Sequence, residues 1–125
     1  MIEFIDVTKT YGEDSAVCDF SLIAPSGKIT VLMGLSGSGK TTLLRAVNKL
    51  VQPTAGSVLI DGNDIADLDS VVLRRSIGYV MQEVGLLPHK SVLDNVTLIA
   101  NIAGQTKDEA LNNALELLEL VGIDD

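Results

Sequence analysis

The sequence predicts an α/β fold organised around a phosphate-binding loop, and three adjacent features predict it. Residues 29–33, Ile-Thr-Val-Leu-Met, form an apolar run with β-branched residues that is typical of a buried strand. Glycines at positions 34, 37 and 39 follow this run, and a helical pattern begins at Lys40. A strand, a glycine-rich loop and a helix in this order form the usual setting of a site for phosphate.

Each residue type in the loop has a physical reason to hold an anion. Glycines permit positive φ and lack the Cβ atoms that would keep a phosphate away from the backbone N–H groups. Lys40 would add a charge for the β- and γ-phosphates, and the Thr41 hydroxyl is an oxygen ligand suited to Mg²⁺. A glycine-rich turn that binds nothing is the alternative interpretation. The residues expected to form a nucleotide site are Gly34, Leu35, Ser36, Gly37, Ser38, Gly39, Lys40, Thr41 and Thr42.

Composition excludes several classes of protein. A chain of 125 residues with 46% hydrophobic residues suits one domain with its own core. The net charge of −8 argues against binding to nucleic acid or to an anionic membrane surface as a main role. No apolar run approaches the roughly 18 residues that a membrane span needs. The single cysteine, Cys18, cannot form an internal disulfide, which points to the cytoplasm, and we interpret it as a small core residue.

The first two thirds of the chain predict an antiparallel start followed by mixed elements. Residues 2–7 alternate between polar and apolar, and residues 17–24 form a second strand across a turn. The strand at 29–33 and the loop follow. The elements expected after the loop are a helix over 40–50, a strand over 57–61, a short helix capped by Asp69 or Ser70, and a buried strand over 76–82.

The last third of the chain predicts two helices, each with a capping signal at its start. Ser91 is followed three residues later by Asp94, which indicates a helix that runs to about residue 103. Thr106 and Glu109 repeat the pattern, and Gly122 is placed to end the second helix. We interpret the second helix as a packing helix whose apolar face consists of Leu111, Ala114, Leu115, Leu118 and Val121.

These separated features together resemble the ATP-binding subunit of ABC transporters, over the whole chain. Tyr11 stands where that family places an aromatic residue that stacks on adenine, and Val17 where a side chain lies beneath the base. Gln82 ends the segment Ile-Gly-Tyr-Val-Met-Gln, which is similar to the family's Q-loop. The resemblance therefore implies ATP and Mg²⁺ as cofactors, Thr41 and Gln82 as metal ligands, and Gln82 as a catalytic residue that also reaches the attacking water. Taken alone, Tyr11 would be interpreted as part of a Tyr-Gly turn, and Gln82 as a surface residue at the end of a strand.

Three short segments of the sequence resemble the ATP-binding subunits of importers of glycine betaine, choline and related osmoprotectants. These segments are 34–39, 73–78 and 85–89. The resemblance implies that the intact protein supplies ATP hydrolysis for uptake of a small solute, a quaternary-amine osmoprotectant. The ATP-binding subunit of this family does not touch the solute, so its class is implied by the resemblance alone.

The resemblance also implies the architecture: a P-loop NTPase core that is incomplete, with an N-terminal antiparallel β subdomain and the start of an α-helical subdomain. The corresponding parts are residues 1–28 for the antiparallel part, 29–82 for the core and 83–125 for the Q-loop and helices. Transmembrane permease subunits would contact the loop around 83–90, and a second ATP-binding subunit would complete a homodimer. The protein would lie in the cytoplasm, at the inner face of the cell membrane, with no membrane span of its own and no nucleic-acid partner.

Several parts of the family's reaction machinery are missing from these 125 residues. They are the signature motif, the Walker B aspartate, the catalytic glutamate and the switch histidine. We expect an ABC-type transport ATPase in the intact protein and almost no hydrolysis by this chain alone, because general-base catalysis contributes about 10²–10⁴ in rate. A naturally truncated module that binds nucleotide or docks on a transporter without turnover is the alternative. A small P-loop kinase is disfavoured, because Arg45, Arg74 and Arg75 form no convincing lid.

The isolated chain is expected to be poorly soluble or oligomeric. In the family, the Walker B strand lies beside the strand that precedes the phosphate loop, so its absence would leave residues 29–33 with an open apolar edge. Such edges promote association. Sedimentation at tens of micromolar measures this directly, and a clean monomer would contradict the expectation.

Overall fold

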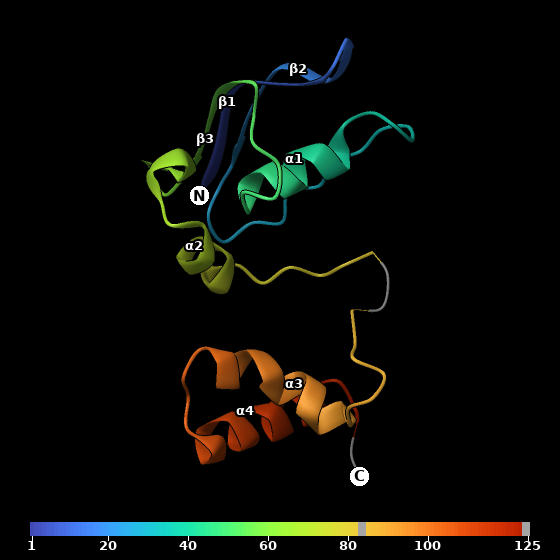
Figure 1. The fold of residues 1–125 in the computed structure, drawn as a ribbon, viewed down its shortest axis with the longest axis vertical. Helices are drawn as coiled ribbons and strands as arrows, with labels where there is room; N and C mark the ends of the chain where they lie inside the picture. The colour runs from blue at the N-terminus through green and yellow to red at the C-terminus, as the bar shows by residue number, and fades with distance from the viewer. Residues whose placement is uncertain (83–84, 124–125) are drawn as a thin grey trace. The chain divides into compact units, whose positions relative to one another are not determined.

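The computed structural model describes residues 1–82 and 85–123. The chain divides into two compact units, Met1–Gly78 and Tyr79–Asp125 (Figure 1). The first unit contains a sheet with helices, and the second contains a pair of helices. In the described residues, no helix has the length and hydropathy that crossing a membrane requires.

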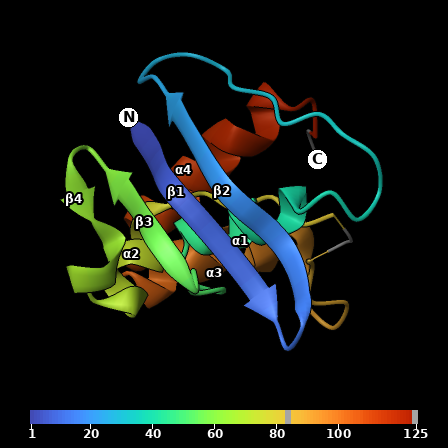
Figure 2. The same ribbon diagram turned by 90° about the horizontal axis from the view of Figure 1, so that it is seen from above.

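The sheet of the first unit has the strand order β2-β1-β3-β4, and all its neighbouring strands are antiparallel (Figure 2). β1 (Ile2–Tyr11) and β2 (Asp14–Ala24) form a hairpin. β3 (Ala55–Ile60) pairs with the other edge of β1, and the short β4 (Asn63–Asp64) returns beside β3. The antiparallel start is therefore confirmed, and both of its strands are longer than predicted.

A bulge in the hairpin turns Phe4 and Val7, an odd number of positions apart, into the same core. Phe4 and Val7 are three positions apart, so a regular strand would put them on opposite faces. Asp6 takes φ 48°, and the register between β1 and β2 shifts between Phe4 and Val7. The Ser21 hydroxyl accepts from the Asp6 N–H at 2.8 Å and donates to the Asp6 carboxylate at 2.9 Å. As a result, both Phe4 and Val7 are buried.

Helix α1 (Lys40–Val47) lies on one face of this sheet (Figures 1 and 2). Its residues Leu43 and Ala46 are buried in one cluster with Val7 and Val58 of the sheet. Burial of a Val or Leu side chain contributes about 1.5–3 kcal/mol relative to exposure. The cluster therefore holds α1, and with it the start of the helix, against the sheet.

Helix α1 ends earlier than the predicted residue 50. Lys49 takes φ 55°, and its N–H donates to the Ala46 carbonyl at 3.1 Å. The Leu50 N–H donates to the Arg45 carbonyl at 2.9 Å. These two bonds satisfy the last carbonyls of the helix and end it at a residue other than glycine.

Two expected strands, at 29–33 and 76–82, are wrong. Within the described part of the chain, residues 29–33 and 77–82 pair with no strand. The side chains of Ile29 and Met33 are 94% and 88% exposed. An apolar β-branched run favours a strand, but a strand forms only where a neighbour supplies the hydrogen bonds of the ladder.

A short helix follows β4 in the first unit. After a 3-10 turn at Ile65–Asp67, α2 (Ser70–Ser76) buries Leu73. Of the two caps considered, Asp69 is the one used: its carboxylate accepts from the N–H groups of Val71 and Val72, each at 2.9 Å. The bonds from Val72 and Val71 lower the pKa of the Asp69 carboxyl.

The second unit consists of α3 (Val92–Ile102) and α4 (Lys107–Leu120), which pack against each other. Both predicted N-caps are confirmed, and of the two, the Thr106 cap forms the full capping box. The Ser91 hydroxyl accepts from the Asp94 N–H at 3.1 Å, and Thr106 and Glu109 form the two reciprocal bonds of a capping box. Helix α4 ends before Gly122, which takes φ 71°.

The predicted apolar face of α4 is confirmed only in part: Ala114 is buried and Leu118 is half-buried. Ala110 and Ala114 are buried, whereas Leu111 and Leu115 are exposed. Alanines four positions apart lie on one face of a helix, and their small size lets a neighbouring helix approach closely. Packing has therefore selected the alanine row.

Replacing Asp69 by Asn should leave stability near neutral pH almost unchanged and remove part of its loss in acid. Asn caps helices as well as Asp does. Because the pKa of Asp69 is lowered by folding, its charge stabilises the folded chain above the unfolded-state pKa of about 4, and this contribution disappears as the pH falls through the lower folded-state value. Urea midpoints at about pH 7 and in steps from about pH 5 to pH 3 measure both effects. Identical acid loss in the wild type and in Asp69→Asn would contradict the assignment, and Asp69→Ala serves as the control without a cap.

Candidate functional site

The predicted phosphate loop, residues 34–39, leads directly into α1. Gly37 and Gly39 take φ 80° and 84°, a region that favours glycine. Gly39 also lies against β2: a Cβ there would be 2.4 Å from the Ala16 carbonyl oxygen and 2.8 Å from Val17 Cγ2. A Cβ at Gly37 would meet nothing within 4 Å among the described residues. Gly39 therefore fixes the distance between the loop and the strand.

The loop itself holds the ammonium group of Lys40. Nζ donates to the Gly34 carbonyl at 2.8 Å, to the Leu35 carbonyl at 2.7 Å and to the Ser38 hydroxyl at 3.1 Å. The Ser38 N–H donates to the Leu35 carbonyl at 3.3 Å, which closes the loop into a turn. These contacts place a full positive charge beside the start of α1, where the positive end of the helix dipole also lies.

Helix α1 begins without a side-chain cap. In the described part of the chain, the other three α-helices start at Asp69, Ser91 and Thr106, whose side chains accept from first-turn N–H groups. The N-cap of α1 is Gly39, which has no side chain. Because the first N–H groups of a helix have no partner inside it, an anion could satisfy them here.

A cavity of about 310 Å³ lies beside the loop. A volume of this size is at the lower end of the range for small-molecule sites. Cys18 is exposed at its wall, so its interpretation as a core residue is wrong. The cavity is lined by Gly34, Ser38 and Lys40 of the loop region, Ala16, Val17, Cys18 and Phe20 of β2, and Leu32, Met33 and Leu43.

The two expected base-binding residues lie on the hairpin. Val17 is buried and lines the cavity beside Lys40. Tyr11 ends β1, and its side chain is 53% exposed. Sequence reasoning missed Lys9, whose Nζ lies 5.0 Å from the centroid of the Tyr11 ring. The available signal was the spacing, since residues two apart on a strand share a face.

The two expected metal ligands lie in different units. Thr41 is exposed in the first turn of α1, and Thr42 beside it is half-buried. Gln82 is an exposed residue of the second unit, so its part in the site stays a prediction. Among residues 1–82 and 85–123, no group of three or more His, Cys, Asp or Glu side chains could hold a metal ion. A single hydroxyl beside a phosphate site still fits Mg²⁺, which takes most of its ligands from phosphate oxygens and water.

The expected docking loop is partly described, since residues 83 and 84 lie outside the described residues. The side chain of Asn95, in α3, forms hydrogen bonds with the described part of this loop. It accepts from the Leu87 N–H at 2.7 Å and donates to the carbonyls of Leu87 at 3.2 Å, Lys90 at 3.3 Å and Ser91 at 2.8 Å. One amide side chain thus ties this segment to the helix that follows it.

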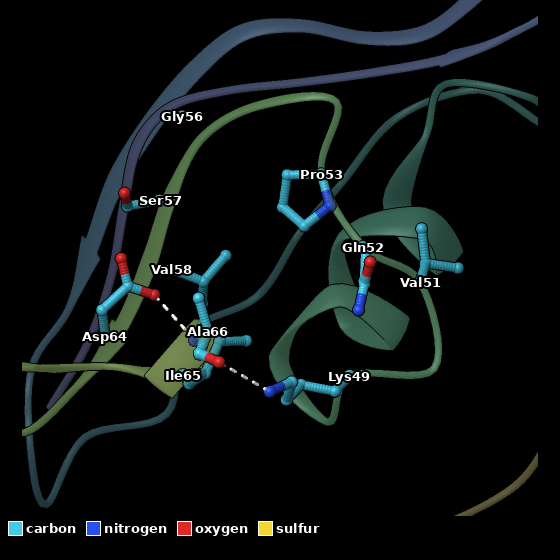
Figure 3. Close-up of a pocket in the computed structure, with 10 residues that line it drawn as sticks. All are labelled: Lys49, Val51, Gln52, Pro53, Gly56, Ser57, Val58, Asp64, Ile65 and Ala66. Carbon is cyan, nitrogen blue, oxygen red and sulfur yellow. Dashed lines mark hydrogen bonds between the residues drawn. The ribbon is translucent and has the colours of Figure 1, made fainter. Parts of the chain in front are cut away.

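A second cavity of about 300 Å³ shares no lining residue with the first (Figure 3). Lys49 Nζ donates to the carbonyls of Ala66 at 3.0 Å and Leu68 at 2.9 Å. The Asp64 carboxylate accepts from the Ala66 N–H at 2.8 Å. Both charged side chains of this wall therefore hold the segment after β4 in place, which is a structural role.

Replacing Gly39 by Ala should destabilise the first unit more than the same change at Gly37. Both variants force an alanine into positive φ, which costs roughly 1–2 kcal/mol. Only Gly39→Ala adds a clash with the backbone of β2. Urea unfolding of the two variants measures the difference in free energy of unfolding. Equal destabilisation would show that the close approach to β2 contributes nothing.

Comparison with known proteins identifies the family. The sequence profile of the ABC transporter family matches residues 17–125. The chain is 38% identical to the osmoprotectant import ATP-binding protein OsmV of Salmonella typhimurium, covering 99% of this chain and 34% of that protein. It is 40% identical to the choline transport ATP-binding protein OpuBA of Bacillus subtilis, covering 97% and 32%. It is 42% identical to the methionine import ATP-binding protein MetN of Brucella abortus, covering 100% and 35%. The chain thus spans about a third of the length of these curated relatives.

A solved structure shares the fold. The dimeric ATP-binding cassette MJ0796, in a post-hydrolysis state bound to ADP and Pi, matches with a TM-score of 0.85 and 34% identity. The match covers 100% of this chain and 59% of that one. A profile match over most of the sequence and a cassette of the same architecture show that this chain belongs to the ABC transporter family and has part of its α/β P-loop NTPase fold.

Proposed function

We propose that this chain binds Mg-ATP through residues 34–42 and is part of the ATP-hydrolysing subunit of an ABC importer. The observation that carries the proposal is the Lys40 ammonium, fixed by loop oxygens at the start of a helix that has no side-chain cap. A fixed cation beside free N–H groups suits a polyphosphate. The names of the relatives, which combine import or transport with ATP binding, support the importer.

Each site residue has a proposed role. Lys40 holds the β- and γ-phosphates, and the loop backbone surrounds them. Thr41 and Gln82 bind Mg²⁺, and Gln82 also orients the attacking water in the intact protein. Tyr11 stacks on adenine with Val17 beneath the base. Stacking of a base on an aromatic side chain contributes about 1–3 kcal/mol in nucleic-acid binders, which is enough to select a nucleotide over a bare polyphosphate.

The partners and solute belong to the same proposal. A second ATP-binding subunit would pair with the intact protein at the inner face of the membrane, and a permease would contact the segment tied by Asn95. The proposed solute is a quaternary-amine osmoprotectant, supported by the names of two relatives. The test compares the uptake of glycine betaine and of methionine in cells with and without the gene. Loss of glycine betaine uptake is expected, and loss of methionine uptake alone would refute this solute class.

Replacing Lys40 by Ala should weaken Mg-ATP binding roughly tenfold or more. Charge-assisted hydrogen bonds contribute about 1.5–3 kcal/mol, and each 1.4 kcal/mol is about tenfold in affinity. Isothermal titration of Mg-ATP into the purified chain measures the dissociation constant.

The matched control is Lys28→Ala, which removes the same charge from an exposed residue outside the loop. This control should bind Mg-ATP like the wild type. Unchanged binding by Lys40→Ala, or an equal loss in both variants, would refute the assignment of the site.

A further inference from the structure

Tyr11 has a neighbour that the proposed function does not use. Its ring is 53% exposed at the end of β1, so little of the surrounding chain fixes its orientation. Immobilising an exposed side chain on binding costs conformational entropy, which would be subtracted from the stacking energy. A contact that orders the ring beforehand would lower this cost.

Lys9 provides such a contact. Its half-buried side chain places Nζ over the Tyr11 ring, 5.0 Å from the centroid. A cation within about 6 Å of a ring centroid is attracted by the negative face of the ring. Because the ammonium lies over one face of Tyr11, a base would stack on the opposite face.

The hairpin register connects this pair to the phosphate loop. Lys9 is the partner of Val17 in the β1–β2 ladder, at a point where the register shifts on both sides of the pair. Val17 lines the cavity that also contains Lys40 and Ser38. Val17 therefore connects the Lys9–Tyr11 pair with the loop, because it is both the ladder partner of Lys9 and a lining residue of that cavity.

We propose that Lys9 is a positioning residue for the nucleotide base: it orders the Tyr11 ring and leaves one face of it for adenine. This inference rests on the proposed function, in which Tyr11 stacks on the base. Lys9 itself contacts neither the base nor the phosphates. Its effect therefore depends on both the base and the Tyr11 ring.

The test compares Mg-ATP with Mg-tripolyphosphate, which lacks the base, by isothermal titration of the whole chain. Lys9→Met keeps the apolar stem and removes the charge, and should weaken Mg-ATP binding about two- to fivefold. It should leave tripolyphosphate binding unchanged. Lys9→Arg keeps a cation over the ring and should bind like the wild type, and Lys9→Gln provides a second charge-removing variant. The control for loss of one surface charge is Lys28→Met.

A double-mutant cycle shows through which residue Lys9 acts. In a Tyr11→Leu background, Lys9→Met should cause no further loss of Mg-ATP affinity. An equal loss in that background would mean that Lys9 contacts the nucleotide directly, and weaker tripolyphosphate binding would mean a phosphate contact; each overturns the proposal. Normal Mg-ATP binding by both Lys9→Met and Lys9→Gln would also overturn it. If the wild type binds neither ligand, the proposed function is refuted. If the wild type binds both and the Lys9 variants bind like it, only the role of Lys9 is refuted.

Discussion

The close approach of Gly39 to the backbone of β2 is the constraint on which the first unit depends. A Cβ at this position would lie 2.4 Å from the Ala16 carbonyl oxygen. With glycine there, α1 starts against the hairpin, and Leu43 and Ala46 reach the core formed with the sheet. The loop before α1 is thereby held beside Val17. Packing of the helix and position of the loop follow from one contact.

The start of α1 differs in charge from the other helix starts in the described residues. The protein carries a net charge of −8, and two of its α-helices use an acidic side chain in their N-terminal caps, Asp69 for α2 and Glu109 for α4. Helix α1 has neither a side-chain cap nor an acid in its first turn, and Lys40 adds a positive charge instead. Of the helix starts in the described residues, that of α1 therefore repels an anion least.

Local signals and the hairpin between neighbouring strands agree with the structure, whereas strands that would need a partner from a distant segment do not. The caps at Ser91 and Thr106 were read correctly, because a capping side chain bonds to a backbone group only three residues away. The apolar runs at 29–33 and 76–82 were assigned to strands incorrectly, because ladder bonds come from another segment. In α4, the predicted burial of Ala114 is confirmed, but Leu111 and Leu115 are exposed and Ala110 is buried instead, because the approach of α3 decides which residues are covered.

Residue types and short spacings are enough to predict the glycine-rich loop, Lys40 after it, the start of α1 and the caps of α3 and α4. These features depend on residue type and on spacings of a few residues, which the chain carries locally. The tertiary structure alone shows that a bulge at Asp6 brings Phe4 and Val7 to one face and that Gly39 lies against β2. Those contacts depend on the relative position of strands and loop, which is set by packing and backbone pairing between segments distant in the sequence.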